Sequence, residues 1–415
     1  MRVLFSSTWG LGHIYPLVPL ARAFAAAGHD VLWATSADSC ERIVAAGLDA
    51  RPAGLAGARL REVVEEQHAA AAAHASPGGQ SAFIFPRMFG GAFAPPMLAD
   101  LLPLARSWQP DLLVHESGEL AAPLVGAILG VPSVTHGYGG AIPASFLAAA
   151  GERVAPLWAQ HGQPLPPYAG CFTSLYLDVC PAAVQTVSTS HIPHIQAMRP
   201  EQDTGQPPAS LPAYLADDER PLVYLTFGTL FNHSPVLRAA ARALAALPVR
   251  LLVTVGPSGD PAALGTALPN VWIERWVHQP QVLQHGHVVA SHAGSGTFLG
   301  ALAGGIPQLC LPQAADQFRN AKAGVRSGAA LALQPEQADS ATIVQAVETL
   351  LADDRYRANA RRVAAEIRAM PSPADVVALL AGVSQSPTVS HSVRGDANGP
   401  ELGTASGCPS PACCW

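Results

Sequence analysis

The sequence predicts an α/β protein with two doubly wound parallel sheets, one in each half of the chain. Residues 3–35 read strand, loop, helix and strand, and residues 110–137 repeat the strand, helix, strand order. A second series of short apolar segments, most of them separated by helical patterns, begins at residue 221. Near-continuous apolar strands of this kind are typical of parallel sheets that are covered on both faces.

Length and composition fit this prediction. A chain of 415 residues is expected to form two or three domains, because single cores stop growing near ~250 to 300 residues, and two is the working prediction. Hydrophobic residues make up 49% of the chain and charged residues only 13%, which indicates a compact globular protein. The formal net charge is -6 and no block of Lys and Arg occurs, so neither nucleic acid nor an anionic membrane surface is an expected partner. Small molecules are the expected partners.

The N-terminus and the cysteines indicate a cytoplasmic protein. The apolar run in "MRVLFSSTWGLGH" is too short for a signal peptide, and no 18-residue apolar segment free of helix breakers follows, so no membrane span is expected. Four of the 7 cysteines are scattered and three lie in the final "CPSPACCW". This spacing indicates neither a disulfide framework nor a metal site, and the tail thiols are interpreted as incidental.

In the first half, the expected strands are "VLFSS" (3–7), "DVLWAT" (30–35), "PDLLVHES" (110–117) and "GVPSVTHG" (130–137). Helices are expected at "LARAFAAAGH" (20–29) and "GELAAPLVGAIL" (118–129). Residues 53–107 look helical and loop-like, and contain the aromatic, Pro-rich piece "FIFPRMFGGAFAPPM".

In the second half, six strands are expected: "PLVYLTF", "RLLVTVG", "NVWIERW", "HVVAS", "PQLCLP" and "AALALQP". The apolar periodicity is lost near residues 196–221, which marks an interdomain linker. We therefore expect a first domain at 1–205, a linker at 206–220, a second domain at 221–383 and a polar, disordered tail at 384–415. Whether the last helices of the second domain pack back on the first domain is left open.

The segment "HAGSGT", residues 292–297, has the features of an anion site. A strand that ends at Ser291, followed by a Gly-Ser-Gly-Thr turn opening a helix, presents unpaired N–H groups and the positive end of the helix dipole to a phosphate. The glycines permit close backbone approach, and the hydroxyls and His292 add donors. A turn that merely caps a helix is the alternative interpretation, and the Gly-Lys-Ser/Thr of a P-loop is absent.

The surrounding sequence carries a resemblance. Residues 272–321, from "WIERWVHQPQVLQHGHVVASHAG" to "GALAGGIPQLCLPQAADQFRNA", resemble the nucleotide-sugar signature of the family 1 GT-B glycosyltransferases. They are most similar to the actinobacterial branch that glycosylates macrolides, enediynes and aromatic polyketides. The opening "GLGHIYPLVPLARAFAAAGHDV" looks like the Gly-His-x-x-Pro loop and helix of that family. The resemblance covers roughly residues 1–380.

The resemblance implies a GT-B fold of two facing Rossmann-like domains, with the acceptor in the first and the donor in the second. It implies inverting transfer of a sugar from a nucleoside diphosphate, by preference thymidine diphosphate, to a hydroxyl of a hydrophobic natural product. The donor would be a co-substrate, with no further cofactor. No Asp-x-Asp motif occurs in the chain, so no metal is expected.

By this resemblance His13 is the general base and Glu116 its carboxylate partner, at a position where the family commonly has Asp. Histidine titrates near pH 6.5, so a large neutral fraction is available to accept a proton at cytoplasmic pH. A carboxylate would hold the tautomer of the base. The alternative for His13 is that it caps a helix beginning near Pro16.

The resemblance also assigns the donor site. Trp276 and Val277 would bind the nucleobase and Gln279 the ribose, with His278 standing where relatives usually have Pro. The remaining donor residues fall into three groups: His292, Gly294, Ser295, Gly296 and Thr297 at the phosphates, Asp316 and Gln317 at the sugar hydroxyls, and Gly228 and Thr229 at either. A core position for Trp276 and a helix N-cap for Asp316 are the alternatives.

The acceptor is expected against the aromatic segment and the "HGYGGAIPASF" loop of the first domain. The side chains proposed to contact it are Phe83, Phe85, Phe89, Phe93 and Tyr138. The alternative is that these aromatic rings belong to the hydrophobic core beneath a helix and to a mobile lid.

Other functions were weighed. A dinucleotide site at "GLGHIY" is excluded because Tyr15 replaces the third glycine and the strand at 30–35 ends without an acidic residue. A nucleotide-sugar epimerase or hydrolase and a non-catalytic activating partner of another transferase stay open. The aglycone, the sugar, the base, O- or C-attachment and a homodimer or auxiliary protein are also left open.

Overall fold

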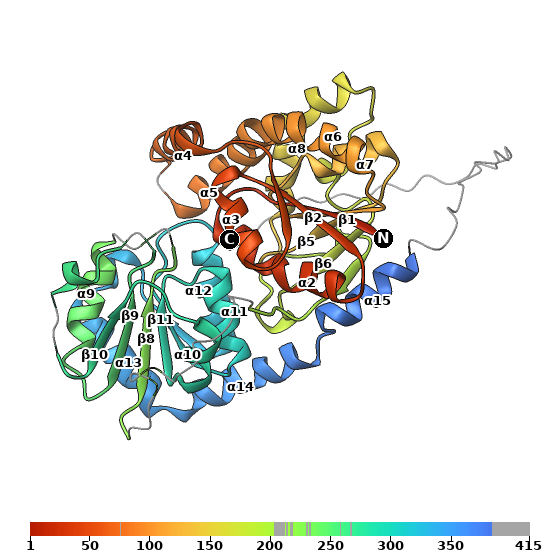
Figure 1. Cartoon of the computed structure of the whole chain (residues 1–415). Coiled ribbons are helices and arrows are strands. Elements are labelled where there is room, and N and C mark those ends of the chain that lie inside the picture. Colours follow the sequence, from red (N-terminus) through yellow and green to blue (C-terminus); the bar gives the residue numbers. More distant parts are fainter. Residues whose placement is uncertain are drawn as a thin grey trace, which may run out of the picture.

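The computed structural model describes residues 1–74, 76–202, 212, 215, 219–229, 231, 234–257, 259–265 and 268–383. These residues form two α/β domains, each built on one parallel sheet (Figure 1). The tail expected at 384–415, with its three cysteines, and most of the linker expected at 206–220 lie outside the described residues.

The first sheet has seven strands in the order β3-β2-β1-β4-β5-β6-β7. Their bounds are β1 Arg2–Ser6, β2 Asp30–Thr35, β3 Asp49–Pro52, β4 Leu112–Glu116, β5 Ser133–His136, β6 Leu175–Asp178 and β7 Ile195–Ala197. The four strands expected from the sequence are confirmed as β1, β2, β4 and β5. The chain order reverses between β1 and β4, and in open α/β sheets ligands bind outside the carboxyl ends of the strands at such a point.

Helices cover both faces of this sheet (Figure 1). They are α1 Leu11–Ile14, η1 Tyr15–Leu17, α2 Val18–Ala26, α3 Ala37–Ala45, α4 Gly57–Ala71, α5 Pro77–Phe85, the π-helical η2 Pro86–Phe93, α6 Ala94–Trp108, α7 Ala122–Leu129, α8 Ala144–Gln160, η3 Pro167–Gly170 and η4 Ala182–Val184. The helix expected at 118–129 begins only at Ala122, because residues 117–121 form a turn that binds two carboxylates.

The α5-η2-α6 run packs on α8 and carries the aromatic segment. A Cβ at Gly90 would lie 2.8 Å from the carbonyl oxygen of Ala150, so only glycine lets η2 approach α8 this closely. Among the described residues, this run, Pro77–Trp108, is one helix long and apolar enough to cross a membrane on length and composition, and half of its most apolar window is buried in the protein. Core helices of globular proteins meet the same criteria.

The second sheet has six strands in the order β10-β9-β8-β11-β12-β13. Their bounds are β8 Leu222–Thr226, β9 Arg250–Thr254, β10 Val271–Glu274, β11 Val288–Ser291, β12 Gln308–Cys310 and β13 Ala330–Ala332. All the strands expected in this half are confirmed. The helices are α9 Pro235–Leu244, η6 Pro261–Leu264, α10 Gln279–His285, α11 Ser295–Ala303, α12 Gln317–Ser327, η7 Pro335–Gln337, α13 Ser340–Ala352, α14 Asp354–Ala369 and α15 Pro373–Val383.

The two domains share packing and polar contacts. Helix α15 leaves the second domain and packs on α2 of the first, where Val376 and Val377 join the same buried cluster as Phe24 (Figure 1). Across the domain boundary, Nη2 of Arg326 donates to the carbonyl oxygen of Gln185 at 2.7 Å. The domains therefore face each other across a defined boundary.

Candidate active site

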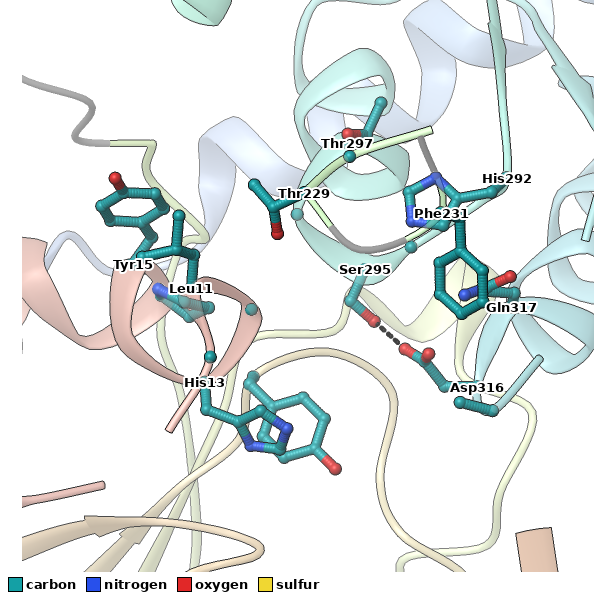
Figure 2. Close-up of a pocket in the computed structure, with 18 of the residues that line it drawn as sticks. Leu11, His13, Tyr15, Thr229, Phe231, His292, Ser295, Thr297, Asp316 and Gln317 are labelled. Carbon is teal, nitrogen blue, oxygen red and sulfur yellow. Dashed lines mark hydrogen bonds between the residues drawn. The ribbon is translucent and has the colours of Figure 1, made fainter. Parts of the chain in front are cut away.

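A cavity of about 480 Å³ lies between the carboxyl ends of the two sheets. The first domain contributes the loop and helix that follow β1, together with α5 and η2. The second domain contributes the turns that follow β8, β11 and β12. Figure 2 shows His13 of the first domain facing Ser295 and Asp316 of the second. The cavity therefore joins the two groups of residues that the sequence assigns to acceptor and donor.

His13 lies in α1, directly after β1, and contacts the cavity. Its Nδ1 is 3.2 Å from Oε1 of Glu116, and its ring centroid lies 4.6 Å from that of Tyr138 and 5.5 Å from that of Phe89. The helix-cap alternative is not observed, because α2 begins after Leu17 and has no side-chain cap. With Nδ1 beside the carboxylate, Nε2 is the ring nitrogen available to a substrate.

Glu116 is the last residue of β4 and is completely buried. Its Oε1 accepts hydrogen bonds from the Thr8 N–H at 3.3 Å and from the Thr8 hydroxyl at 2.7 Å, and its Oε2 accepts from the Gly118 N–H. Burial raises the pKa of Glu116, but the opposing effects of His13, Thr8 and Gly118 are larger and leave it lowered. Glu116 is therefore ionised in the folded protein.

The same carboxylate acts on His13. Burial lowers the pKa of His13, but the attraction of Glu116 and Asp316 outweighs burial and leaves the pKa raised above 6.5. The pair has the spacing of a general base beside a carboxylate: Nδ1 lies at ion-pair distance from Glu116, without a well-formed hydrogen bond, and the Nε2 lone pair is available for a proton.

A second buried carboxyl group, Glu119, was not singled out from the sequence. It accepts hydrogen bonds from the Ser6 hydroxyl and from the Ala121 and Ala122 N–H groups, so it caps the start of α7. Burial raises its pKa to about 7. Glu119 is not in contact with the cavity, and its role is to stabilise the turn between β4 and α7.

The expected phosphate site lies where β11 leads into α11, and the N-terminus of α11 is open to the cavity there. Gly294 occupies the N-cap without a side-chain cap, and the first hydrogen bond of the helix runs from the Phe298 N–H to the Gly294 carbonyl oxygen at 2.9 Å. The N–H groups of Ser295, Gly296 and Thr297 precede it and lie at the cavity. This arrangement suits an anion.

His292 lies beneath this turn and is buried. A Cβ at Gly228 would lie 2.9 Å from its Cε1, and a Cβ at Gly294 2.5 Å from its Nε2, so both glycines make room for the ring. Burial lowers the pKa of His292 to about 4, so the ring is neutral near pH 7. Ala293, next to it, has a φ of 62°, which strains a residue other than glycine.

Asp316 and Asn320 extend the polar group. Oδ2 of Asp316 accepts hydrogen bonds from Ser295 Oγ at 2.6 Å and from Asn320 Nδ2 at 3.2 Å (Figure 2). Asp316 occupies the N-cap position of α12 but makes no side-chain cap, so the N-cap alternative is not observed. Oε1 of Gln317 accepts from the N–H groups of Gln313 and Ala314, which fixes the loop after β12.

At the opposite end of the donor half, Trp276 is 46% exposed and contacts the cavity, so it is not a core residue. Val277 is buried beside it. His278 accepts a hydrogen bond from the Gln281 N–H at 3.3 Å and so caps α10.

Gln279 links this end to the phosphate turn. Its Nε2 donates to Thr297 Oγ1 at 3.2 Å, and its Oε1 accepts from Gln202 Nε2 at 3.0 Å. Gln202 also donates to the Gly296 carbonyl oxygen at 2.6 Å. Gln202 was not expected at the site, because it lies far from the donor motif in sequence. With Gly228 and Thr229, all the donor residues named from the sequence contact this one cavity.

Of the five side chains proposed to contact the acceptor, Phe85, Phe89 and Tyr138 contact the cavity. Phe83 and Phe93 do not line it. Phe83 lies on another face of α5, where it packs on His74 and under the Arg87 guanidinium, and Phe93 is buried against α4. The cavity instead takes Ser81, Ile84, Phe85, Met88 and Phe89, whose i, i+3, i+4, i+7, i+8 spacing is the signal that identifies this face.

Further residues that the sequence did not predict are brought to the cavity by tertiary packing. They add apolar surface and are Trp9, Leu11, Ile142 and Phe146. Within the described ranges, no three His, Cys, Asp or Glu side chains group closely enough to hold a metal ion.

Comparison with known proteins identifies the fold and the chemistry. Residues 22–200 match the N-terminal domain and residues 243–383 the C-terminal domain of the erythromycin biosynthesis protein CIII-like family. The L-demethylnoviosyl transferase of Streptomyces niveus is 31% identical over 94% of this chain and 100% of its own.

Two solved structures cover 92% of this chain. The Streptomyces sp. SF2575 glycosyltransferase SsfS6, complexed with thymidine diphosphate, superposes with a TM-score of 0.74 at 27% identity and 99% of its own length. The spinosyn rhamnosyltransferase SpnG, complexed with spinosyn aglycone, superposes with a TM-score of 0.75 at 29% identity and 100% of its length. The expected GT-B fold is confirmed.

Proposed function

Because this chain belongs to the erythromycin biosynthesis protein CIII-like family of GT-B glycosyltransferases, we propose that it moves a deoxysugar from a thymidine diphosphate donor to a hydroxyl of a hydrophobic natural product, with inversion. One observation carries the proposal: a histidine paired with a buried carboxylate and an open helix N-terminus contact the same cavity from opposite domains. SsfS6 binds thymidine diphosphate and SpnG binds an aglycone, which supports both substrate classes. The reaction is proposed to take place in the cytoplasm.

The acceptor half supports general base catalysis. The acceptor hydroxyl binds beside Nε2 of His13, which removes its proton as the oxygen attacks the anomeric carbon. Glu116 stabilises the imidazolium that forms, because the attraction that raises the pKa of His13 acts only on the charged ring. Attack on the face opposite the departing diphosphate inverts the anomeric centre.

The donor half supports departure of the nucleoside diphosphate. The N–H groups of Ser295, Gly296 and Thr297 and the α11 dipole meet the negative charge that develops on the phosphate oxygens. His292 is neutral, so it contributes a hydrogen bond and not a positive charge. Asp316 and Gln317 bind sugar hydroxyls, and the exposed Trp276 ring stacks on the pyrimidine.

The first experiment is calorimetric titration of thymidine diphosphate and uridine diphosphate into wild type and His292→Ala, with no acceptor. We expect wild type to prefer thymidine diphosphate and His292→Ala to bind it about 10-fold or more weakly, since a hydrogen bond to a charged group contributes roughly 1.5–3 kcal/mol. Absence of binding by wild type would overturn the donor site.

Catalysis is tested next with donor sugar and an acceptor panel. His13→Ala is expected to keep nucleotide affinity and lose about 10²- to 10⁴-fold in turnover, the range of general base catalysis. The anomeric coupling constant of the product reports inversion. Rapid donor turnover by wild type without any acceptor would instead favour a hydrolase or epimerase.

A further inference from the structure

One oxygen of the buried Glu116 carboxylate contacts both His13, the proposed base, and Thr8. Oε1 lies 3.2 Å from His13 Nδ1, and the same atom accepts from the Thr8 hydroxyl at 2.7 Å and from the Thr8 N–H at 3.3 Å. Thr8 is 4% exposed and follows β1 by two residues. Of these contacts, the shortest is that of the Thr8 hydroxyl.

A glutamate needs such support. Its side chain has three rotatable bonds, and fixing a chain of this kind costs up to about 1.5–2 kcal/mol in rotamer freedom. Here Gly118 holds Oε2 and Thr8 holds Oε1, so the carboxylate is fixed at both ends. A Cβ at Gly118 would lie 2.9 Å from Phe89, so this glycine also lets the Phe89 ring approach the His13 ring.

Thr8 is itself anchored. Its carbonyl oxygen accepts from Thr35 Oγ1 at 3.3 Å, Ser7 Oγ donates to the same Thr35 oxygen at 3.2 Å, and Trp33 Nε1 donates to Ser7 Oγ at 3.0 Å. All four side chains are buried. These hydrogen bonds end on the main-chain carbonyl of Thr8, so they fix the backbone that carries the hydroxyl and preorganise it to orient Glu116.

We propose that Thr8 is a positioning residue, whose hydroxyl holds Oε1 of Glu116 against Nδ1 of His13 and so fixes the tautomer and charge of the base. The inference rests on the proposed role of His13 as that base. Nothing in the donor site depends on it, since Thr8 does not contact the cavity.

The test is the titration of His13 in the free protein, followed by NMR on histidine-labelled wild type, Thr8→Val and Thr8→Ser. The signal is assigned among the 15 histidines by its loss in His13→Gln. The charged groups acting on His13 are Glu116 from β4 and Asp316 from the start of α12, and Tyr138 stays neutral because burial raises its pKa.

Thr8→Val removes the hydroxyl and keeps the N–H contact. Once Oε1 is loosened or protonated, burial dominates, and we expect the pKa of His13 to fall by about 1. Thr8→Ser keeps the hydroxyl and is expected to titrate as wild type does. An unchanged titration in Thr8→Val, a rise, or a Thr8→Ser curve that follows Thr8→Val would overturn the proposal.

Thr8→Ala provides a second route if Thr8→Val does not fold. It also removes the hydroxyl and keeps the Thr8 N–H contact with Oε1, so the pKa of His13 should fall in this variant too. An unchanged His13 titration in a folded Thr8→Ala would contradict positioning.

Two controls separate this inference from the proposed function. Thermal melting shows whether each variant is folded, and thymidine diphosphate affinity is expected to equal that of wild type. If wild type bound no nucleotide, the proposed function would fail while the His13 titration would still decide the role of Thr8. Turnover on an acceptor found in the panel should fall about 10-fold in Thr8→Val and recover in Thr8→Ser, with the donor KM unchanged.

Discussion

His13 and His292, which both line the cavity, are placed in opposite electrostatic environments. Beside Glu116, His13 has a pKa raised above 6.5, whereas burial lowers that of His292 to about 4. One ring can therefore gain a proton during the reaction while the other stays neutral.

At the residue level this predicts the pH dependence of the reaction. A base must be neutral to accept a proton, so kcat/KM should rise with pH through the raised pKa of His13 and level off above it. His292 should add no step above pH 5. In Glu116→Gln the acid limb should move to lower pH and the plateau should fall; a limb that stayed in place would mean that Glu116 does not act on the base.

Two glycines near His292, Gly294 and Gly296, allow a matched pair of alanine variants that tests the position of the His292 ring. Gly294 has an ordinary negative φ, so Gly294→Ala adds no backbone strain but places Cβ 2.5 Å from His292 Nε2. At Gly296 a Cβ meets nothing within 4 Å. We expect Gly294→Ala to weaken thymidine diphosphate binding by about 10-fold, as one displaced donor would, and by more than Gly296→Ala, measured by calorimetry. Equal losses would point to crowding of the phosphates and not to movement of His292.

At the level of helices and strands, apolar runs and local motifs predicted most of the elements that the structure shows. Buried strands such as β4 and β8 begin with runs of apolar residues, and the turn at β11 and α11 is encoded by adjacent residues. The strands β3, β6 and β7 were not predicted. β3 and β7 are short and largely exposed at the edges of the sheet, and β6 has only four residues although it lies inside the sheet.

The parts of the site that the sequence did not reveal come from distant segments. Thr8 meets Glu116 across 108 residues, and Gln202 meets Gln279 across 77. No local pattern marks such pairs, since they arise from strand order and domain packing. The positions of Phe83 and Phe93 away from the cavity have another cause: these rings were grouped by type, whereas the helix period decides which of them reach the cavity.

Helix α5 therefore allows a test with adjacent residues. Ile84 contacts the cavity and Phe83 does not. Ile84→Ala should raise the acceptor KM, by up to about 10-fold for a side chain worth roughly 1.5 kcal/mol, and leave the donor KM unchanged. Phe83→Ala should leave both constants near wild type although it removes the larger side chain. A larger acceptor effect from Phe83→Ala would place the acceptor elsewhere.

At the scale of the whole molecule, three buried histidines govern stability in acid. Burial lowers the pKa values of His115, His136 and His292 to about 4. Such groups stabilise the folded state fully above their unfolded pKa of about 6.5, and the contribution is lost as pH falls toward 4. The raised pKa values of His13 and Glu119 have the opposite sign: their stabilisation is present below the unfolded pKa values and is lost as pH rises through the folded ones, so they offset part of the loss in acid.

We therefore expect the thermal midpoint to fall steeply between pH 6.5 and 4. His136 offers the variant, because its Nδ1 bonds only to the neighbouring Gly137 carbonyl oxygen and its buried Nε2 has no partner among the described residues. His136→Leu should flatten the acid limb of the midpoint curve, measured by calorimetry from pH 4 to 8. A curve as steep as that of wild type would assign the acid sensitivity to other groups.

The return of α15 to α2 has a consequence for how the protein is made. The apolar face of α2 takes part of its covering from the last described helix of the chain. During synthesis at about 5–20 residues per second, the first domain therefore waits on the order of ten seconds or more, after its own strands have emerged, for the segment that completes its surface. A ribosome stalled anywhere in the second half of the coding sequence would carry a first domain whose apolar α2 surface is exposed. Such a surface is a natural target for chaperones.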